Sequence, residues 1–381
     1  MNPGLPDSTA FRRLKRSIAR VGRTHYPRFL FGGGLSEGEI PVFTYHDIEA
    51  SELEDDLRFL ERNGYRTLSL DEYLDRMRAS RPSAERCVLL TFDDARRSFW
   101  EAALPVLERR AAHAVLFTPT YWIADGSAAR PDSDPPGFMS WEQIAHCERH
   151  ALIDVEAHGH RHALVFTSSR LAGFATPSTL AAYDLFDWPM RKAGGRDVCG
   201  RPPLGTPIYE SMPLLSATER VIEPELAAVT CRSLVETEGG PAFFARPDAL
   251  VELRAAHAAV ASRVPVERLS AAEMRREIEA ELSAVTDCFR SRLGRKPRCF
   301  AYPWMLGGTE SLAMLADLGF DAAFGVALDF RRIRAEAAPL PVFARYKSDW
   351  LQFLPGTGRR RLLDVLPRKI SAFFATQHFA H

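Results

Sequence analysis

Short apolar runs alternate with longer amphipathic segments between residues 40 and 160, and this alternation constrains the fold more than any other feature. The runs 40–46, 86–94, 113–120 and 152–160 are typical of strands, and the segments 51–63, 99–110 and 140–150 are typical of helices. Strands that alternate with helices indicate a parallel sheet with crossover helices. The sequence therefore predicts an α/β fold, in which residues 298–304, 320–327 and 339–346 resume the strand pattern.

Polar side chains gather where these predicted strands end. His46 follows the first strand, Asp93 and Asp94 end the strand 86–94, and three histidines lie in "EAHGHRHA". The carboxyl ends of parallel strands meet at one edge, which carries the active site in a βα barrel. We therefore expect these side chains to lie close together.

The spacing of the three histidines favours a ligand pair. On one helical turn His158 and His162, at i and i+4, would point the same way, whereas His160 would face away. Two histidines and one aspartate leave coordination positions open, as in catalytic metal sites. A solvated histidine-rich loop is the alternative, and an Asp-Asp pair alone is usually a cap or a solvated turn.

The motifs "TFDDA", "FMSWEQI…VEAHGHRH" and "CFAYPWM", with the opening "IPVFTYHDI", resemble the polysaccharide deacetylase family (carbohydrate esterase family 4, the NodB homology domain). The resemblance covers residues 40–165 and 290–346. It implies a distorted (β/α)7 TIM-like barrel that hydrolyses N- or O-acetyl groups of sugars.

The resemblance also implies roles for individual residues. Asp93 would be the catalytic base, and Asp94, His158 and His162 would hold a divalent metal. Zinc is the usual ion, with Ni²⁺, Co²⁺ or Mn²⁺ as alternatives. The metal would polarise the acetyl carbonyl and acidify a water.

Two departures from the family pattern concern the base and the acid. Ala301 stands where an arginine that orients the base is common, and Arg345 is a candidate substitute. The late Leu-x-His motif that supplies the acid is not visible. His46 is the best replacement acid, ahead of Asp47, although a histidine at a strand end is often only structural.

Candidate substrate contacts come from two segments. Tyr302, Pro303 and Trp304 follow a strand and are expected to form a sugar-facing wall, with core packing as the alternative. Tyr209 and Glu210 lie in a Pro-rich loop that is expected near the site.

The strand–helix alternation is lost from about residue 163 to 292, which predicts an inserted lid or subdomain. The predicted organisation is a basic N-terminal helix and linker (1–38), a deacetylase barrel (39–350) and a C-terminal tail helix (351–381). A basic amphipathic helix binds anionic membrane surfaces, but a short helix packed on the domain explains the same pattern.

Composition narrows the function classes. The formal net charge is zero, so bulk nucleic-acid binding is not indicated. The six cysteines are scattered without a CxxC pair, as expected in a reducing compartment. No secretory signal or bilayer-spanning run is evident. Residence in the cytoplasm is expected, with contact to the inner membrane face through the basic helix.

The sequence thus predicts a metal-dependent N-deacetylase of an amino-sugar substrate. An N-acetylated glycoside, an intracellular glycan precursor or a lipid-linked glycan suits the predicted location better than an extracellular polymer. The alternatives are a metal amidohydrolase that acts on a non-sugar C–N bond and a catalytically silent barrel that binds glycans or partners.

Overall fold

The centre of the molecule is a parallel sheet. The computed structural model describes residues 27–79, 85–124, 137–261, 263–325 and 339–361. Neighbouring strands lie in the order β14-β13-β12-β5-β4-β3-β1-β15, and β2 pairs with β3 outside this series. They are β1 (Val42–Tyr45), β2 (Tyr65–Thr67), β3 (Arg86–Phe92), β4 (Ala114–Thr118), β5 (Ile153–Ala157), β12 (Cys299–Ala301), β13 (Ala322–Phe324), β14 (Val342–Phe343) and β15 (Arg345–Lys347).

The two edges of this sheet meet in one short segment. β14 pairs with β13, whereas β15, separated from β14 by a single residue, pairs with β1. The segment 342–347 therefore closes the sheet into a ring with β1, β3, β4, β5, β12 and β13. All of these pairings are parallel. The predicted (β/α)7 barrel is confirmed.

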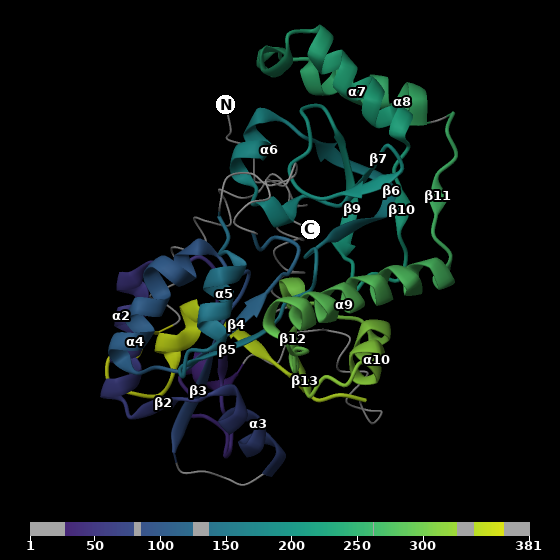
Figure 1. The fold of residues 1–381 in the computed structure, drawn as a ribbon. Helices are drawn as coiled ribbons and strands as arrows, with labels where there is room; N and C mark the ends of the chain where they lie inside the picture. Colours follow the sequence, from purple (N-terminus) through teal and green to yellow (C-terminus); the bar gives the residue numbers. More distant parts are fainter. Residues whose placement is uncertain (1–26, 80–84, 125–136, 262, 326–338, 362–381) are drawn as a thin grey trace, which may run out of the picture.

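Helices cover the outside of the barrel and one helix lies at its lower end (Figure 1). The covering helices are α2 (Ala50–Arg62), α4 (Leu104–Arg110), α5 (Trp141–Glu148), α9 (Ala271–Leu293) and α10 (Thr309–Asp317). Their apolar side chains share one large core with the outward-facing strand residues. α3 (Leu70–Ala79) instead packs Leu70, Tyr73 and Leu74 against the inward-facing residues.

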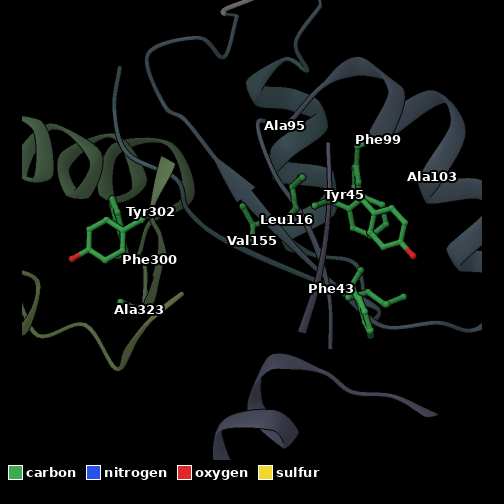
Figure 2. Close-up of a cluster of buried hydrophobic side chains, with 14 of the residues drawn as sticks. Phe43, Tyr45, Ala95, Phe99, Ala103, Leu116, Val155, Phe300, Tyr302 and Ala323 are labelled. Atoms are coloured by element: carbon green, nitrogen blue, oxygen red, sulfur yellow. The ribbon is translucent and has the colours of Figure 1, made fainter. Parts of the chain in front are cut away.

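Alternation along β3 determines which face each side chain joins. Val88 and Leu90 belong to the outer core, whereas Leu89 belongs to the inner cluster. Figure 2 shows part of the outer core, with Phe43 and Leu116 among its labelled residues. Because the side-chain period of a strand is two, Asp93 falls on the inward face with Leu89.

Residues 164–268 contain a second group of elements, which Figure 1 shows above the barrel. Its main sheet pairs β6 (Leu164–Phe174) with β9 (Pro207–Pro213) in antiparallel fashion. The other α-helices and strands are α6 (Pro177–Ala182), β7 (Arg191–Ala193), β8 (Arg196–Val198), β10 (Val221–Ile222), α7 (Glu225–Thr237), α8 (Ala249–Ala261) and β11 (Glu267–Arg268). α7 and α8 contribute to a separate apolar cluster.

The long helix α9 lies, except for its last residue, in the stretch 163–292 that the sequence suggests as an insertion, yet it packs on the barrel. Met274, Ile278 and Leu282 recur at helical spacing and join the barrel's outer core. The boundaries given above for the insertion and the tail stay predictions.

The predicted basic helix falls within residues 1–26, and most of the predicted tail helix falls within residues 362–381, so both lie outside the described residues. Among the residues that are described, no helix has the length and apolar character needed to cross a bilayer.

Candidate active site

Three ligand-type side chains converge at the upper mouth of the barrel. Asp94 follows β3, and His158 and His162 follow β5. One ligand atom from each lies within 4.8 Å of the others, and all three residues are buried. Asp94 Oδ1 is 3.5 Å from Nε2 of His158 and 3.5 Å from Nε2 of His162.

Two of the polar atoms that face the centre of this group make no hydrogen bond within the described residues. Asp94 Oδ1 and His158 Nε2 are buried and have no hydrogen-bond partner among the described residues. His158 Nδ1 donates to the Ala301 carbonyl at 2.8 Å, which leaves a lone pair on Nε2. Buried polar atoms are rarely left unpaired, so this arrangement fits a divalent metal.

The charge states also suit metal binding. Burial lowers the pKa of His162 to about 3, so its imidazole is neutral near pH 7. Burial opposes ionisation of Asp94, but His158 and His162 hold its pKa below the usual range. A carboxylate and neutral imidazoles are the forms that bind metal.

The backbone that carries the histidines differs from the expected helical turn. Residues 158–162 form a bend after β5, with positive φ at Gly159 (80°) and at His162 (51°). Glu281 of α9 holds this bend, because its Oε1 accepts the backbone N–H groups of His160 (2.9 Å) and Arg161 (2.6 Å). The helical geometry predicted for the pair is wrong, although the pair does converge.

His160 lies apart from the ligand group, as expected, but for a different reason. Its Nδ1 is within 2.8 Å of the Thr120 hydroxyl, so the ring turns toward the segment after β4. The left-handed backbone at His162 then returns that side chain to the centre.

Asp93 sits beside the ligand group in a buried ion pair. Its Oδ1 accepts from Arg345 Nη1 at 2.6 Å, and both residues are almost fully buried. Its Oδ2 lies 3.5 Å from His158 Nε2. Burial alone would raise the pKa of Asp93, but the charge of Arg345, with His158 and His46, lowers it. Arg345 on β15, the candidate substitute for an arginine at position 301, therefore contacts Asp93 directly.

We expect Arg345→Met to move the acidic limb of the kcat/KM profile to higher pH. Loss of the guanidinium leaves burial to raise the pKa of Asp93, so Asp93 ionises only at higher pH. Breaking a buried pair also costs about 3–5 kcal/mol of stability, and thermal unfolding would register this. Arg345→Lys keeps the charge and should shift the limb less; identical profiles for wild type and both variants would refute the assignment.

His46 faces Asp93 from the end of β1. Its Nε2 is 3.8 Å from Asp93 Oδ2, and 53% of its side chain is exposed. A group that reaches both the site and solvent can exchange protons with either. Asp47, the alternative acid, accepts from the Ser98 hydroxyl at 3.0 Å instead.

Side chains from residues 164–268 complete the walls of the site. The ring of Phe186 stacks on His162 at 4.0 Å. Arg96 lies 3.5 Å from Asp94 Oδ2 and 2.8 Å from Asp184 Oδ1, with its guanidinium over Phe186. Arg96, Asp184 and Phe186 could not be predicted from the sequence, because no local pattern links positions so far apart.

Of the three residues predicted to form a sugar-facing wall, only Trp304 has an exposed surface beside the ligand group. Tyr302 faces outward, is fully buried and lies 3.3 Å from the Ser311 hydroxyl, because the alternation of β12 turns Ala301 inward instead. Pro303 is also buried. Trp304 alone is partly exposed, and its ring lies 4.2 Å from that of His162.

The other two predicted substrate contacts have partners of their own. Tyr209 is buried on β9, and its hydroxyl is 2.8 Å from His257 Nε2. Glu210, the next residue, points to the other face and pairs with Arg170. The structure does not bring either side chain to the ligand group.

Glu281→Ala is expected to weaken metal binding by about 10- to 100-fold, the usual effect of removing a partner that orients ligands. The two backbone N–H groups of the histidine bend would lose their acceptor. Competition with a chromogenic chelator measures the affinity. Glu281→Gln keeps an acceptor oxygen and serves as the control; equal affinities for Glu281→Ala and wild type would contradict this role.

Comparison with known proteins agrees with the motifs. Residues 80–205 match the polysaccharide deacetylase family model. The poly-beta-1,6-N-acetyl-D-glucosamine N-deacetylase of Escherichia coli K12 is 28% identical over 127 residues, which cover 32% of this chain and 19% of that protein. The matched region therefore spans about a fifth of that relative's length.

Two solved structures are similar at lower identity. IcaB from Ammonifex degensii is 17% identical, with a TM-score of 0.47 over 83% of this chain and 94% of that chain. The BpsB deacetylase domain from Bordetella bronchiseptica is 16% identical, with a TM-score of 0.49 over 81% and 95%. The predicted resemblance is confirmed by the family match: residues 80–205, which include Asp93, Asp94, His158 and His162, match the polysaccharide deacetylase family model.

Proposed function

We propose that the protein is a metal-dependent hydrolase that removes the N-acetyl group from an amino-sugar substrate. The main support for this proposal is that a group of metal-ligand side chains and a buried, ion-paired carboxylate lie within a few ångströms of each other. Asp94, His158 and His162 offer converging ligand atoms, and Asp93, held by Arg345, presents its second oxygen beside them.

The ligand group suits zinc, which takes nitrogen and oxygen ligands and keeps an open position in catalytic sites. Ni²⁺, Co²⁺ and Mn²⁺ accept similar ligands. A divalent ion held here would polarise the acetamide carbonyl and acidify a water. Orphaned buried atoms on Asp94 and His158 support such an ion.

Asp93 would act as the general base. Arg345 fixes Oδ1, so Oδ2 is the oxygen left to accept a proton from the attacking water. The lowered pKa keeps this carboxylate ionised near pH 7. Ion pairing also fixes its orientation, which a base needs for proton transfer at hydrogen-bond distance.

His46 would act as the general acid. Breakdown of the tetrahedral adduct requires a proton on the departing nitrogen, because an amine anion is a very poor leaving group. His46 lies on the solvent side of Asp93, so a proton taken by Asp93 can pass to the leaving amine through this imidazole. His46→Ala should therefore impair turnover more than metal binding.

The substrate class is proposed from the family match and from the named relative, which acts on an N-acetylglucosamine polymer according to its name. An N-acetylated glycoside or a lipid-linked glycan contains the same acetamide. The proposal of membrane contact is based only on the basic sequence within residues 1–26, which lie outside the described residues.

Release of acetate from a panel of N-acetylated glycosides tests this proposal. We expect the zinc-loaded protein to release acetate, and the chelated protein to release none. Acetate release from simple N-acylated amines but not from glycosides would instead favour a non-sugar amidohydrolase. Binding of glycans without release of acetate would favour a catalytically silent barrel that only binds glycans.

A further inference from the structure

A cavity lies beside the ligand group, between the paired strands β6 and β9 and the loop after β12. Its volume is about 460 Å³. Trp304 lines this cavity and also lies 4.2 Å from the ring of His162. Leu164, which follows His162 by two positions, lines it as well. The cavity is therefore next to the active site and shares a wall with it.

The lining of the cavity is aromatic and apolar. Phe174, Tyr183, Trp188, Met212, Trp304 and Leu306 contribute much of it. Tyr183 and Trp188 meet edge to face, with ring centroids 5.5 Å apart. Met212 is 43% exposed, so this part of the lining reaches the surface. Rings set at an angle to one another present flat surfaces on which an apolar ring can pack.

Polar groups in the lining are largely occupied within the protein. The Thr179 hydroxyl donates to the Thr176 carbonyl at 3.1 Å, and the Tyr209 hydroxyl pairs with His257. Asp187 accepts the backbone N–H of Asp184 at 3.0 Å. No lysine or arginine lines the cavity among the residues that are described. Trp188 Nε1 is a buried donor without a partner among the described residues, but one donor cannot satisfy several hydroxyls. Burying several sugar hydroxyls or a phosphate here would therefore leave polar groups poorly compensated.

The size of the cavity suits a ring system. A cavity of about 150 Å³ holds one benzene molecule, so the volume of about 460 Å³ here accommodates a fused bicyclic ring with room to spare. Such a volume is in the usual range for small-molecule sites, roughly 300–1,000 Å³.

We propose that this cavity binds an apolar, ring-containing aglycone of an N-acetylated glycoside whose acetamide lies at the metal-ligand group. This inference rests on the proposed function, since it places the acetamide beside Asp93. Trp304 would contact both parts of the substrate. The aglycone in the cavity would then determine which glycosides are processed, because its burial contributes binding energy that a simple methyl glycoside lacks.

Binding of a free bicyclic aglycone, 4-methylumbelliferone, tests the cavity without relying on turnover. Fluorescence titration of the metal-loaded protein should show saturable binding. Ala172→Phe and Ser211→Phe fill the cavity from β6 and β9 and should weaken that binding at least tenfold. Val229→Phe, on an exposed face of α7, is the matched control and should leave it unchanged. Absence of saturable binding, or equal binding in all variants, would overturn the inference.

Deacetylation of matched glycosides tests the link to the active site. We expect kcat/KM for the 4-methylumbelliferyl N-acetylglucosaminide to exceed that for the methyl glycoside at least tenfold, and Ala172→Phe to remove the difference. Equal values, or a preference for an octyl glycoside, would overturn the ring-aglycone assignment while leaving the proposed function intact. If no glycoside releases acetate, the proposed function fails, and the 4-methylumbelliferone titration still decides whether the cavity binds rings.

Discussion

Asp93→Asn is expected to retain bound metal and to lose acetate release by about 10²- to 10⁴-fold, the usual contribution of a general base. The amide keeps the size of the side chain and can still contact Arg345, but it cannot accept the proton of the attacking water. The ligand group of Asp94, His158 and His162 does not include Asp93, so metal content should be unaffected.

Metal analysis and acetate release, measured on the same preparation, check this result. Asp55→Asn is the matched control, because Asp55 is an exposed carboxylate of α2. Its activity should equal that of wild type. Undiminished activity of Asp93→Asn would remove Asp93 as the base, whereas joint loss of metal and activity would assign it to the ligand group instead.

His158→Ala and His162→Ala are each expected to lose most of the bound metal and with it nearly all activity. Wild type should carry about one divalent ion per chain, as a site with three protein ligands does. Each substitution removes one of the three donors that converge among the described residues. His160→Ala is the control, because His160 lies in the same bend but contacts Thr120.

Elemental analysis after dialysis measures the metal content of the three variants. We expect His160→Ala to retain its metal and the other two variants to lose most of theirs. Full stoichiometry in both His158→Ala and His162→Ala would contradict the ligand assignment. Loss in all three would show that the substitutions disrupt the bend, and circular dichroism would then report a structural change as well.

The barrel and the location of the site could be predicted from the sequence because both depend on local patterns. The run of apolar residues before Asp93 predicts a buried strand, and the alternation of strands and helices predicts parallel pairing. Parallel pairing in turn brings the ends of β3 and β5 to one edge. The proximity of Asp94 to the histidines can therefore be predicted without knowledge of tertiary contacts.

The details that the sequence could not supply depend on contacts between distant segments. A spacing of four suggests a helix, but Glu281 from α9 instead holds the histidines in a bend. Arg345 could be named from the sequence only as a candidate, because nothing local predicts that β14 and β15 close the barrel and bring it to Asp93.

Tyr302 shows a different reason for failure. Its position after a strand was compatible with either face, and only the register of β12 determines that Ala301 faces the barrel interior. An aromatic residue next to a site motif is therefore weak evidence for substrate contact. Trp304, two residues later, reaches the site because the strand has ended and its backbone has a positive φ of 50°.

Simultaneous measurement of acetate and free amine shows directly whether this site removes N-acetyl groups from sugars. The zinc-loaded protein, incubated with an N-acetylated glycoside, should yield acetate and amino sugar in equal amounts. Chelation should stop both, and added zinc should restore both. If metal-loaded protein yields neither product from any N-acetylated glycoside, the protein is not an N-deacetylase of amino sugars.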